Sequence, residues 1–435
     1  MCGIYGTSLK YSEKQIKEKL DRTAFRGPDK MGWQFYELNN TRITLGHNRL
    51  SILDLEARSN QPFNYSDYIN IVYNGEIYNF RNIKKNLIKI GYKFKTTSDT
   101  EVLCAAYLEY GEECVNYFNG MFSFVIYDER KKILFGARDR LGQKPLYYYH
   151  KNKAFEFSSQ LSSIQLHNEN LSISKSAIGY YLTWGYIPDP HSILNEVQKL
   201  KAGHSFKFNI LNGAMTTKCY WDLDYKGIKR YEGSYENAKN DLDKLLNDAI
   251  SKRLYADVPV GVFLSGGIDS SIVAAIAARN SSAKLKTFSV KFNDDKFDES
   301  KYAKTVADYL GTSHNVINCD YNDGLKLIDN FSHFYDEPFA DSSAIPSMLL
   351  AKNTKKQVTV ALTGDGGDES FLGYSRYNWV KNKSKIYDIP YPLRILISEL
   401  LMNVPNYKLK IIAKGLRPKN KNLAYLSVMT GINLS

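Results

Sequence analysis

Residues 258–271 read VPVGVFLSGGIDSS, an order of residues that suits a phosphate site. An apolar, β-branched run ends at Ser265-Gly266-Gly267 and an alanine-rich segment follows, which predicts a buried strand, a tight loop and a helix. Paired glycines let backbone N–H groups approach an anion, serine hydroxyls add donors, and the helix contributes its positive end. Asp269 adds a carboxylate that could hold Mg²⁺. We therefore expect a phosphate site rather than an ordinary glycine turn.

This loop differs from the GxxxxGKS or GxxxxGKT type of nucleotide loop, because no lysine follows its glycines. It resembles instead the SGGxDS pyrophosphate loop of ATP pyrophosphatases, which cleave ATP between the α and β phosphates. The resemblance implies ATP as a substrate and chemistry at the α phosphate.

A second reactive group stands at the front of the chain, where Cys2 follows the initiator methionine. Removal of the methionine, which a small second residue favours, leaves one residue with both a thiol and an α-amine. An α-amine has a pKa of about 7.7 and can take the proton of the thiol, so no histidine is needed to activate the nucleophile. A lone cysteine is usually inert packing, and position alone leaves the two interpretations about even.

Arg49 offers a planar, two-pronged clamp for a carboxylate, with a surface ion pair as the ordinary alternative. It lies in the segment from Arg42 to Leu55, whose alternating pattern predicts a strand. His47 in the same segment is better explained as a structural histidine than as a catalyst.

Asn74 and Gly75 follow an apolar strand that begins at Tyr68. The pair could simply turn a hairpin. Alternatively, the amide of Asn74 and the N–H of Gly75 are two neighbouring donors that could hold a developing oxyanion. Further along, residues 98–101 (SDTE) predict a helix start with a capping box, and Asp99 within them could also face a substrate ammonium.

The elements that must position these groups change character along the chain. In the first half, many strands, few helices and a nucleophile at the mature terminus predict a layered α+β fold. A helix expected at 234–254 opens the second half, where the pattern becomes repeated strand and helix. Such alternation predicts a parallel, doubly wound sheet with ligands at the carboxyl ends of its strands. These strands are expected at 258–264, 286–292, 314–318 and 357–362.

The expected strand ends carry the remaining polar residues. Residues 363–369 (TGDGGDE) close the last strand, and residues 336–346 lie in a loop before it. A loop of glycines and acids is taken by default for a turn. In a chain that already has a phosphate loop, it is better explained as the second wall of a nucleotide and metal site. Asp269 and Asp368 could then share Mg²⁺ with the pyrophosphate.

The composition excludes several other classes. Hydrophobic residues make up 43% and charged residues 24%, as in ordinary globular proteins, and no apolar run approaches the ~20 residues of a membrane span. The start lacks a secretory signal, and five cysteines without metal-like spacing indicate reduced thiols, so we expect a cytoplasmic protein. The net charge is +12, but the lysines are scattered, which favours a solvated surface over a nucleic-acid site.

Taken together, the motifs of the first half resemble the class II glutaminase domain of glutamine-dependent asparagine synthetases. In the order of that family they read CGI from Cys2, RGPD from Arg26, HNRLS from His47, NGEIYN from Asn74, SDTE from Ser98 and RDRLGQKPLY from Arg138. The resemblance implies an α+β N-terminal-nucleophile fold of αββα type. It also implies roles: Cys2 is the nucleophile, Arg49 binds the glutamine α-carboxylate, Asn74 and Gly75 form the oxyanion hole, and Glu76 and Asp99 bind the α-amine.

The second half resembles the ATP-pyrophosphatase domain of the same family, an α/β parallel-sheet domain. Asp365 is implied as the residue that receives protons from attacking ammonia, and Asp269 and Asp368 as the metal ligands. The implied ATP-binding residues are Leu264, Ser265, Gly266, Gly267, Asp269, Ser270, Val290, Thr363 and Gly364.

The chain departs from the family in two places. Residues 370–374 read SFLGY where the family usually has LFGGY, so Leu372 replaces a glycine and could tighten or move that loop. The KVDR and RxPFLD segments of the family do not occur between Val380 and Ser435. We therefore expect a C-terminally incomplete synthetase domain, as in a fragment or in a chain that has lost part of the site.

These observations predict a class II glutamine amidotransferase domain over 2–205, a linker over 206–233 and an asparagine-synthetase-like domain over 234–435. The expected activity is that of a carbon–nitrogen ligase of amino-acid biosynthesis, in which ATP adenylates aspartate and ammonia from glutamine amidates it. Another acceptor, such as a sugar acid in surface-polysaccharide synthesis, is one alternative. A truncated chain that only hydrolyses glutamine or binds a ligand is another. The expected partners are glutamine, aspartate, ATP and Mg²⁺, without nucleic acid or membrane, and a homodimer is left open.

Overall fold

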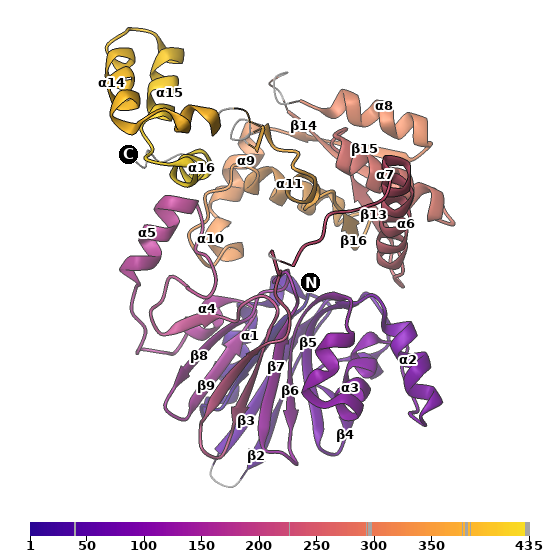
Figure 1. The fold of residues 1–435 in the computed structure, drawn as a ribbon. Coiled ribbons are helices and arrows are strands. Elements are labelled where there is room, and N and C mark those ends of the chain that lie inside the picture. Colours follow the sequence, from indigo (N-terminus) through magenta and orange to yellow (C-terminus); the bar gives the residue numbers. More distant parts are fainter. Residues whose placement is uncertain are drawn as a thin grey trace.

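The computed structural model describes residues 1–38, 41–225, 227–292, 294, 298–375, 377–378, 382 and 384–430 of the 435. An N-terminal domain lies below a C-terminal domain in the view of Figure 1. No helix in these ranges is long and apolar enough to cross a membrane. All five cysteines are free thiols, as their spacing indicates.

Two six-stranded antiparallel sheets form the centre of the N-terminal domain. Their orders are β10-β8-β9-β1-β3-β2 and β12-β11-β7-β6-β5-β4. Side chains of both sheets, among them Val72, Val125, Phe155 and Phe206, share one buried core. The strands are β1 (Gly3–Thr7), β2 (Lys30–Leu38), β3 (Thr41–Arg49), β4 (Phe63–Ser66), β5 (Ile69–Ile77), β6 (Gly120–Asp128), β7 (Ile133–Arg138), β8 (Tyr147–Lys151), β9 (Ala154–Ser158), β10 (Val197–Lys199), β11 (His204–Asn209) and β12 (Met215–Cys219).

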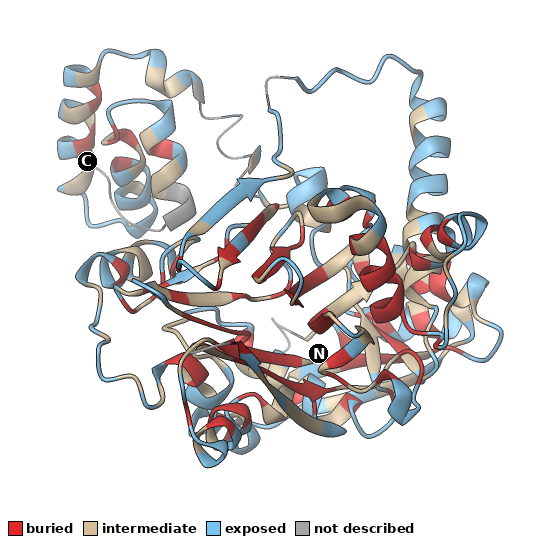
Figure 2. Cartoon of the chain, turned by 90° about the horizontal axis from the view of Figure 1, so that it is seen from below, coloured by how far each residue is buried: buried red, intermediate tan, exposed pale blue. Residues whose placement is uncertain are grey.

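Helices cover the outer faces of the two sheets, which confirms the αββα arrangement. Helices α1 (Glu13–Asp21) and α4 (Leu161–Gln165) contact the first sheet, and α2 (Phe80–Lys89) and α3 (Asp99–Tyr110) lie over the second. Figure 2 shows buried residues running along the strands and along the helix faces that pack on them. Helix α5 (Lys175–Trp184) lies beyond this core.

Two expectations for this domain need correction, and one of two alternatives is excluded. Strand β3 ends at Arg49, and the chain then enters a loop instead of continuing as a strand to Leu55. Asn74 and Gly75 lie inside β5 and pair with Ser123 and Phe122, so they do not turn a hairpin. Strand β11 pairs with β7, so the expected boundary at 205 would cut the second sheet, which ends with β12 at Cys219.

The C-terminal domain contains a four-stranded parallel sheet of order β15-β14-β13-β16. Helices α6 (Tyr235–Arg253), α7 (Ile268–Asn280) and α8 (Ser300–Leu310) share a buried core with β13, while α9 (Tyr321–Ile328) and α11 (Ala344–Thr354) pack together elsewhere on the sheet. The parallel, doubly wound prediction is confirmed. The strands are β13 (Val260–Phe263), β14 (Lys286–Phe292), β15 (Ser313–Cys319) and β16 (Val360–Leu362).

Near the C-terminus, α14 (Tyr391–Met402) and α15 (Tyr407–Leu416) pack against each other, and α16 (Lys421–Thr430) contacts α5. Arg394 of α14 is buried and donates hydrogen bonds to the carbonyl oxygens of Leu416, Pro418 and Lys419. Removing this guanidinium would leave three buried carbonyl groups without their donor, so Arg394 is a structural residue.

Candidate active sites

Cys2 lies immediately before β1, in a corner formed with the end of β3. Its Sγ atom is 3.4 Å from the backbone nitrogen of Leu50, which donates to it. Arg26 Nε donates to the carbonyl oxygen of Cys2 at 3.2 Å, and another nitrogen of the same guanidinium donates to Gln160 Oε1 at 3.0 Å. The backbone around the thiol is therefore held from two sides.

Burial controls the acid–base properties of this corner. It lowers the pKa of the terminal α-amine, here that of Met1, and the nearby Lys144 ammonium acts in the same direction, so that this pKa is about 5. It also raises the pKa of the Cys2 thiol and lowers the pKa of Lys144 to about 8. An amine in this environment is neutral at physiological pH, and the thiol keeps its proton. Such an amine can accept the proton of Sγ when the sulfur attacks.

The side chain of Asn74 is fully buried in β5 and is poised as a donor. Neither its amide nitrogen nor its amide oxygen has a hydrogen-bond partner among the described residues. An unpaired buried amide costs about 1–3 kcal/mol, so this one is expected to meet a ligand or a water molecule. A Cβ atom on Gly75 would lie 2.3 Å from the carbonyl oxygen of Met121, so the backbone here fits only glycine. This geometry suits an oxyanion site.

Two carboxylates lie close together beside Asn74. Asp99 is buried and accepts hydrogen bonds from the Tyr73 hydroxyl at 2.7 Å and the Ile77 N–H at 2.9 Å. Burial raises the pKa of Asp99 to about 6. Burial and the charge of Asp99 raise the pKa of Glu76 well above its usual range. A cation between them would favour their ionised forms, and an amino-acid α-ammonium is such a cation.

The guanidinium of Arg49 is engaged with the loop that follows β3. It donates to the carbonyl oxygens of Leu53, Asp54 and Glu56, and to Asn60 Oδ1 at 2.8 Å. Arg49 therefore shapes the loop that borders the Cys2 corner. Its contact with a glutamine carboxylate stays a prediction.

His47 is structural, as its sequence context indicates. Its Nε2 atom donates to the carbonyl oxygen of Tyr73 at 3.0 Å, and burial lowers its pKa to about 3. The imidazole is therefore neutral, and its hydrogen bond connects β3 to β5.

The expected capping box at the start of α3 is wrong in one part. Ser98 does cap the helix by accepting from the N–H of Thr100 at 3.0 Å. Glu101, however, accepts from the N–H groups of Lys95 and Thr96 instead of returning to the N–H of Ser98. Its carboxylate stabilises the turn that places Asp99 at the start of α3.

The second site is the loop between β13 and α7, which has the predicted strand, loop and helix order. The Oγ atoms of Ser265 and Ser270 lie 2.9 Å apart, and the N–H of Gly267 donates to Ser265 Oγ at 3.1 Å. Gly266 has a φ of 89°, and a Cβ there would lie 2.6 Å from the Cβ of Tyr302. The glycine and the serines together fix the shape of this corner at the start of α7.

The loop after β16 packs directly on this corner. A Cβ on Gly364 would lie 2.8 Å from the nitrogen of Ser270, and a Cβ on Gly367 would lie 2.4 Å from Cγ of Asp269. The structure therefore brings Asp269 next to the segment that holds Thr363, Asp365 and Asp368, as the sequence predicts.

These residues fit a magnesium ion that is shared with phosphate. The described residues contain no cluster of three or more His, Cys, Asp or Glu side chains that could hold a metal ion by itself. Mg²⁺ in nucleotide sites commonly takes one or two carboxylates and completes its shell with phosphate oxygens and water. Asp269 and Asp368 match this arrangement.

One cavity of about 2200 Å³ connects the two domains. Met1, Arg26 and Gln160, next to Cys2, line its lower end. Cys2, Arg49, Asn74, Gly75, Glu76 and Asp99 are not among the lining residues, so the glutamine site adjoins the cavity without being part of it. The predicted ATP-site residues that line its other end are Leu264, Ser265, Gly267, Asp269, Ser270, Val290, Thr363, Gly364, Asp365 and Asp368.

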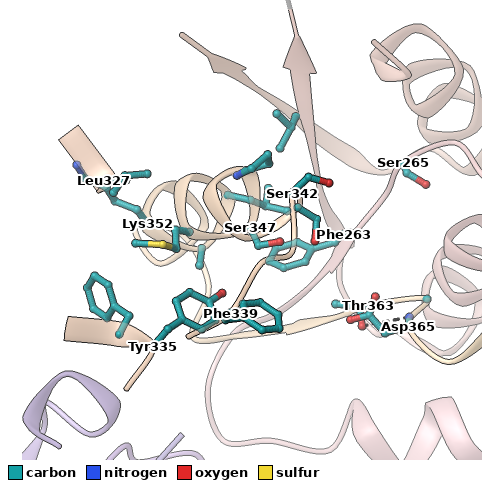
Figure 3. A pocket seen from close by; sticks show the side chains of 18 of the residues that line it. Phe263, Ser265, Leu327, Tyr335, Phe339, Ser342, Ser347, Lys352, Thr363 and Asp365 are labelled. Atoms are coloured by element: carbon teal, nitrogen blue, oxygen red, sulfur yellow. Dashed lines mark hydrogen bonds between the residues drawn. The ribbon is translucent and has the colours of Figure 1, made fainter. Parts of the chain in front are cut away.

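Several aromatic side chains line the cavity together with charged and polar ones, and the sequence did not predict them. Tyr335 and Phe339 stack with ring centroids 5.0 Å apart, and Figure 3 shows both among the residues that line the pocket with Thr363 and Asp365. Phe25 of the first domain contacts Phe334 edge to face at 5.1 Å. The aromatic run FSHFYDEPF at 331–339 was the available signal, but nothing in it indicates contact with another domain.

The fold and the two sites define a class of protein, an N-terminal-nucleophile glutamine amidotransferase joined to an ATP-pyrophosphatase domain. Residues 1–221 match the family described as "Glutamine amidotransferase domain", and residues 241–425 match the family described as "Asparagine synthase". The chain belongs to the family of glutamine-hydrolysing asparagine synthetases.

Curated relatives agree with this assignment. A protein of Methanocaldococcus jannaschii, provisionally named glutamine-hydrolysing asparagine synthetase 2, is 40% identical over 425 residues, which cover 92% of this chain and 81% of the relative. Asparagine synthetase 1 of Bacillus subtilis is 34% identical, with 93% of this chain and 64% of the relative covered. Amidase chry2 of Gibberella zeae is 33% identical, and the match covers 84% of this chain and 56% of the relative. Because relatives with different names share the fold, family membership alone does not fix the acceptor.

Proposed function

We propose that the protein makes asparagine from aspartate, with ATP as the activating substrate and glutamine as the nitrogen donor. The observation that carries the proposal is the cavity of about 2200 Å³, which reaches from the residues beside Cys2 to the phosphate loop at Ser265. A shared interior space is what a reaction needs if one site releases ammonia and the other consumes it.

In the first half-reaction, Cys2 Sγ attacks the amide carbon of glutamine. The α-amine takes the thiol proton and passes it to the leaving nitrogen, which departs as ammonia, and water then hydrolyses the thioester to glutamate. The buried amide of Asn74 and the N–H of Gly75 stabilise the oxyanion of each tetrahedral intermediate. Glu76 and Asp99 hold the substrate ammonium.

In the second half-reaction, the β-carboxylate of aspartate attacks the α phosphorus of ATP and displaces pyrophosphate. Backbone N–H groups of the loop at 265–267 and the start of α7 bind the phosphates. Asp269 and Asp368 would hold Mg²⁺, which neutralises pyrophosphate charge when bound. Ammonia then attacks the acyl carbon, Asp365 accepts a proton, and AMP leaves with formation of asparagine.

The nature of the cavity wall supports transfer of ammonia in its neutral form. The aromatic side chains of Phe334, Tyr335 and Phe339 line part of the cavity. Such apolar surface disfavours ammonium relative to ammonia, and exclusion of water protects the acyl-adenylate from hydrolysis.

Pyrophosphate release tests this function. We expect release that requires aspartate and is supported by either glutamine or ammonium. The Cys2→Ala variant should lose glutamine support and keep ammonium support. Loss of both in a folded variant would contradict the two-site mechanism.

A different carboxylate acceptor is the second candidate, and the 33% identity to a relative named amidase favours it. Pyrophosphate release with another acid, such as a sugar acid, but not with aspartate would support that candidate. Glutamate formation without pyrophosphate release for any acid would indicate a glutaminase alone.

A further inference from the structure

Glu337 of the C-terminal domain is bound by three donors of the N-terminal domain. Its Oε1 atom accepts from the N–H of Ile193 at 2.8 Å. Its Oε2 atom accepts from the Tyr147 hydroxyl at 3.1 Å and lies 2.6 Å from Lys199 Nζ. The donors come from β8, from β10 and from the segment before β10, so one carboxylate joins three parts of the other domain.

The neighbours of Glu337 are attached to the same domain. Asp336 Oδ2 accepts from the N–H of Ser162 at 3.1 Å, and the N–H of Ala340 donates to the carbonyl oxygen of Gly185 at 2.8 Å. The carboxylate of Asp336 also attracts Arg26, whose guanidinium binds the carbonyl oxygen of Cys2. Residues 336–340 therefore form a docking loop that reaches to the backbone of the nucleophile.

The ion pair of Glu337 with Lys199 is nearly closed to water. The side chains are 10% and 12% exposed. Solvent screens such a pair weakly, and truncating one partner leaves the other charge buried without compensation. Most of the remaining ion pairs are exposed pairs within one element or domain, such as Lys207 with Glu112 at 2.8 Å. Loss of the Glu337 carboxylate should therefore weaken the contact between the two domains.

The same residues form part of the cavity wall. Tyr147, Lys199, Asp336 and Glu337 all line the cavity. Burial and the adjacent Glu337 raise the pKa of Tyr147 well above its usual range, so the hydroxyl stays a donor. Because Lys199 already compensates the carboxylate, ammonia that passes this point meets a neutral pair rather than a free acid.

We propose that Glu337 is a positioning residue that seals the two domains together at the docking loop, so that ammonia released at Cys2 reaches the adenylate instead of solvent. This inference rests on the proposed function, because a seal matters only if ammonia crosses the cavity. The partners of Glu337 are Tyr147, Ile193 and Lys199, none of which is a predicted site residue, so it acts through the loop that it anchors.

The test compares Glu337→Ala and Glu337→Gln with the control Glu112→Ala, which breaks an ion pair inside the N-terminal domain. Glutamate and pyrophosphate are measured together with glutamine, ATP and aspartate present. The wild type and the control should form equal amounts of the two products. Glu337→Ala should form severalfold more glutamate than pyrophosphate, while ammonium-supported pyrophosphate release stays unchanged. Glu337→Gln keeps an acceptor for Ile193 but loses the charge that faces Lys199. Its ratio of glutamate to pyrophosphate should therefore lie between the ratios of the wild type and Glu337→Ala.

Hydrogen–deuterium exchange adds a readout that does not depend on synthesis. The amides of Ser162 and Ile193 should exchange faster in Glu337→Ala and at the wild-type rate in Glu112→Ala. Unchanged exchange at these amides, or equal glutamate and pyrophosphate in Glu337→Ala, overturns the inference. If the wild type itself releases no pyrophosphate, the proposed function fails, and the exchange rates alone decide whether Glu337 anchors the loop.

Discussion

The carboxylate of Asp257 accepts a hydrogen bond from the backbone N–H of Asp54 at 2.8 Å. The N–H of Asp257 in turn donates to the carbonyl oxygen of Ile52 at 3.0 Å. Asp257 precedes β13, the strand that carries the phosphate loop, whereas Asp54 belongs to the loop held by Arg49. The Asp54 carboxylate also accepts from the N–H of Thr97, just before α3. The strand of the ATP site is thus attached to two segments that shape the glutamine site.

Substitution Asp257→Ala should weaken glutamine binding. The loop around Arg49 loses its attachment, and loss of one hydrogen bond worth about 1 kcal/mol corresponds to roughly a fivefold rise in KM for glutamine. The rate of glutamate formation at varied glutamine concentration gives this KM. Asp257→Asn retains an acceptor oxygen and should stay close to the wild type. A KM that is the same in all three proteins would contradict the role of this contact.

Substitution Asn74→Ala should lower the rate of glutamine hydrolysis without lowering the stability of the fold. Loss of one oxyanion donor lowers kcat for glutamine hydrolysis by about 10²–10³. The thermal unfolding temperature should stay unchanged or rise, because the substitution removes a buried amide that has no partner among the described residues. A large fall in unfolding temperature would indicate that Asn74 supports the fold instead.

The pH dependence of glutamine binding should follow Asp99. Its pKa is raised to about 6, so the carboxylate is ionised above that pH and protonated below it. Protonation removes the charge that faces the substrate ammonium, so KM for glutamine should rise between about pH 7 and about pH 5. Asp99→Asn should have a high KM with no rise over that range. A wild-type KM that is constant there would show that Asp99 does not bind the ammonium.

Features that are local in the sequence were predictable, and features that depend on distant partners were not. The phosphate loop at 265–267 was predicted because its strand, glycines and helix are consecutive. The choice between hairpin and oxyanion site at Asn74 needed the pairing of β5 with β6, which adjacent residues do not encode. Strand β11 crosses the expected boundary at 205, because its pairing with β7 joins residues that are far apart in the sequence.

Contacts between the domains had no sequence signal at all. Glu337 and Lys199 are ordinary charged residues in segments far apart along the chain, and their burial depends on how the domains meet.

Leu372 stands where the family usually has glycine, and the structure gives the substitution a measurable consequence. Its φ is 57°, in the left-handed region, at the end of α12 (Gly367–Phe371). This conformation costs an L-residue about 1–2 kcal/mol, whereas glycine loses roughly 0.5–1 kcal/mol more backbone entropy on folding. The side chain is 65% exposed, so little packing is lost. Leu372→Gly should therefore raise the free energy of unfolding by about 0.5–1 kcal/mol in denaturant titrations. Leu372→Ala keeps the Cβ atom and its strain, and should show no such gain; equal stability of the two variants would mean that the loop is not strained at this residue.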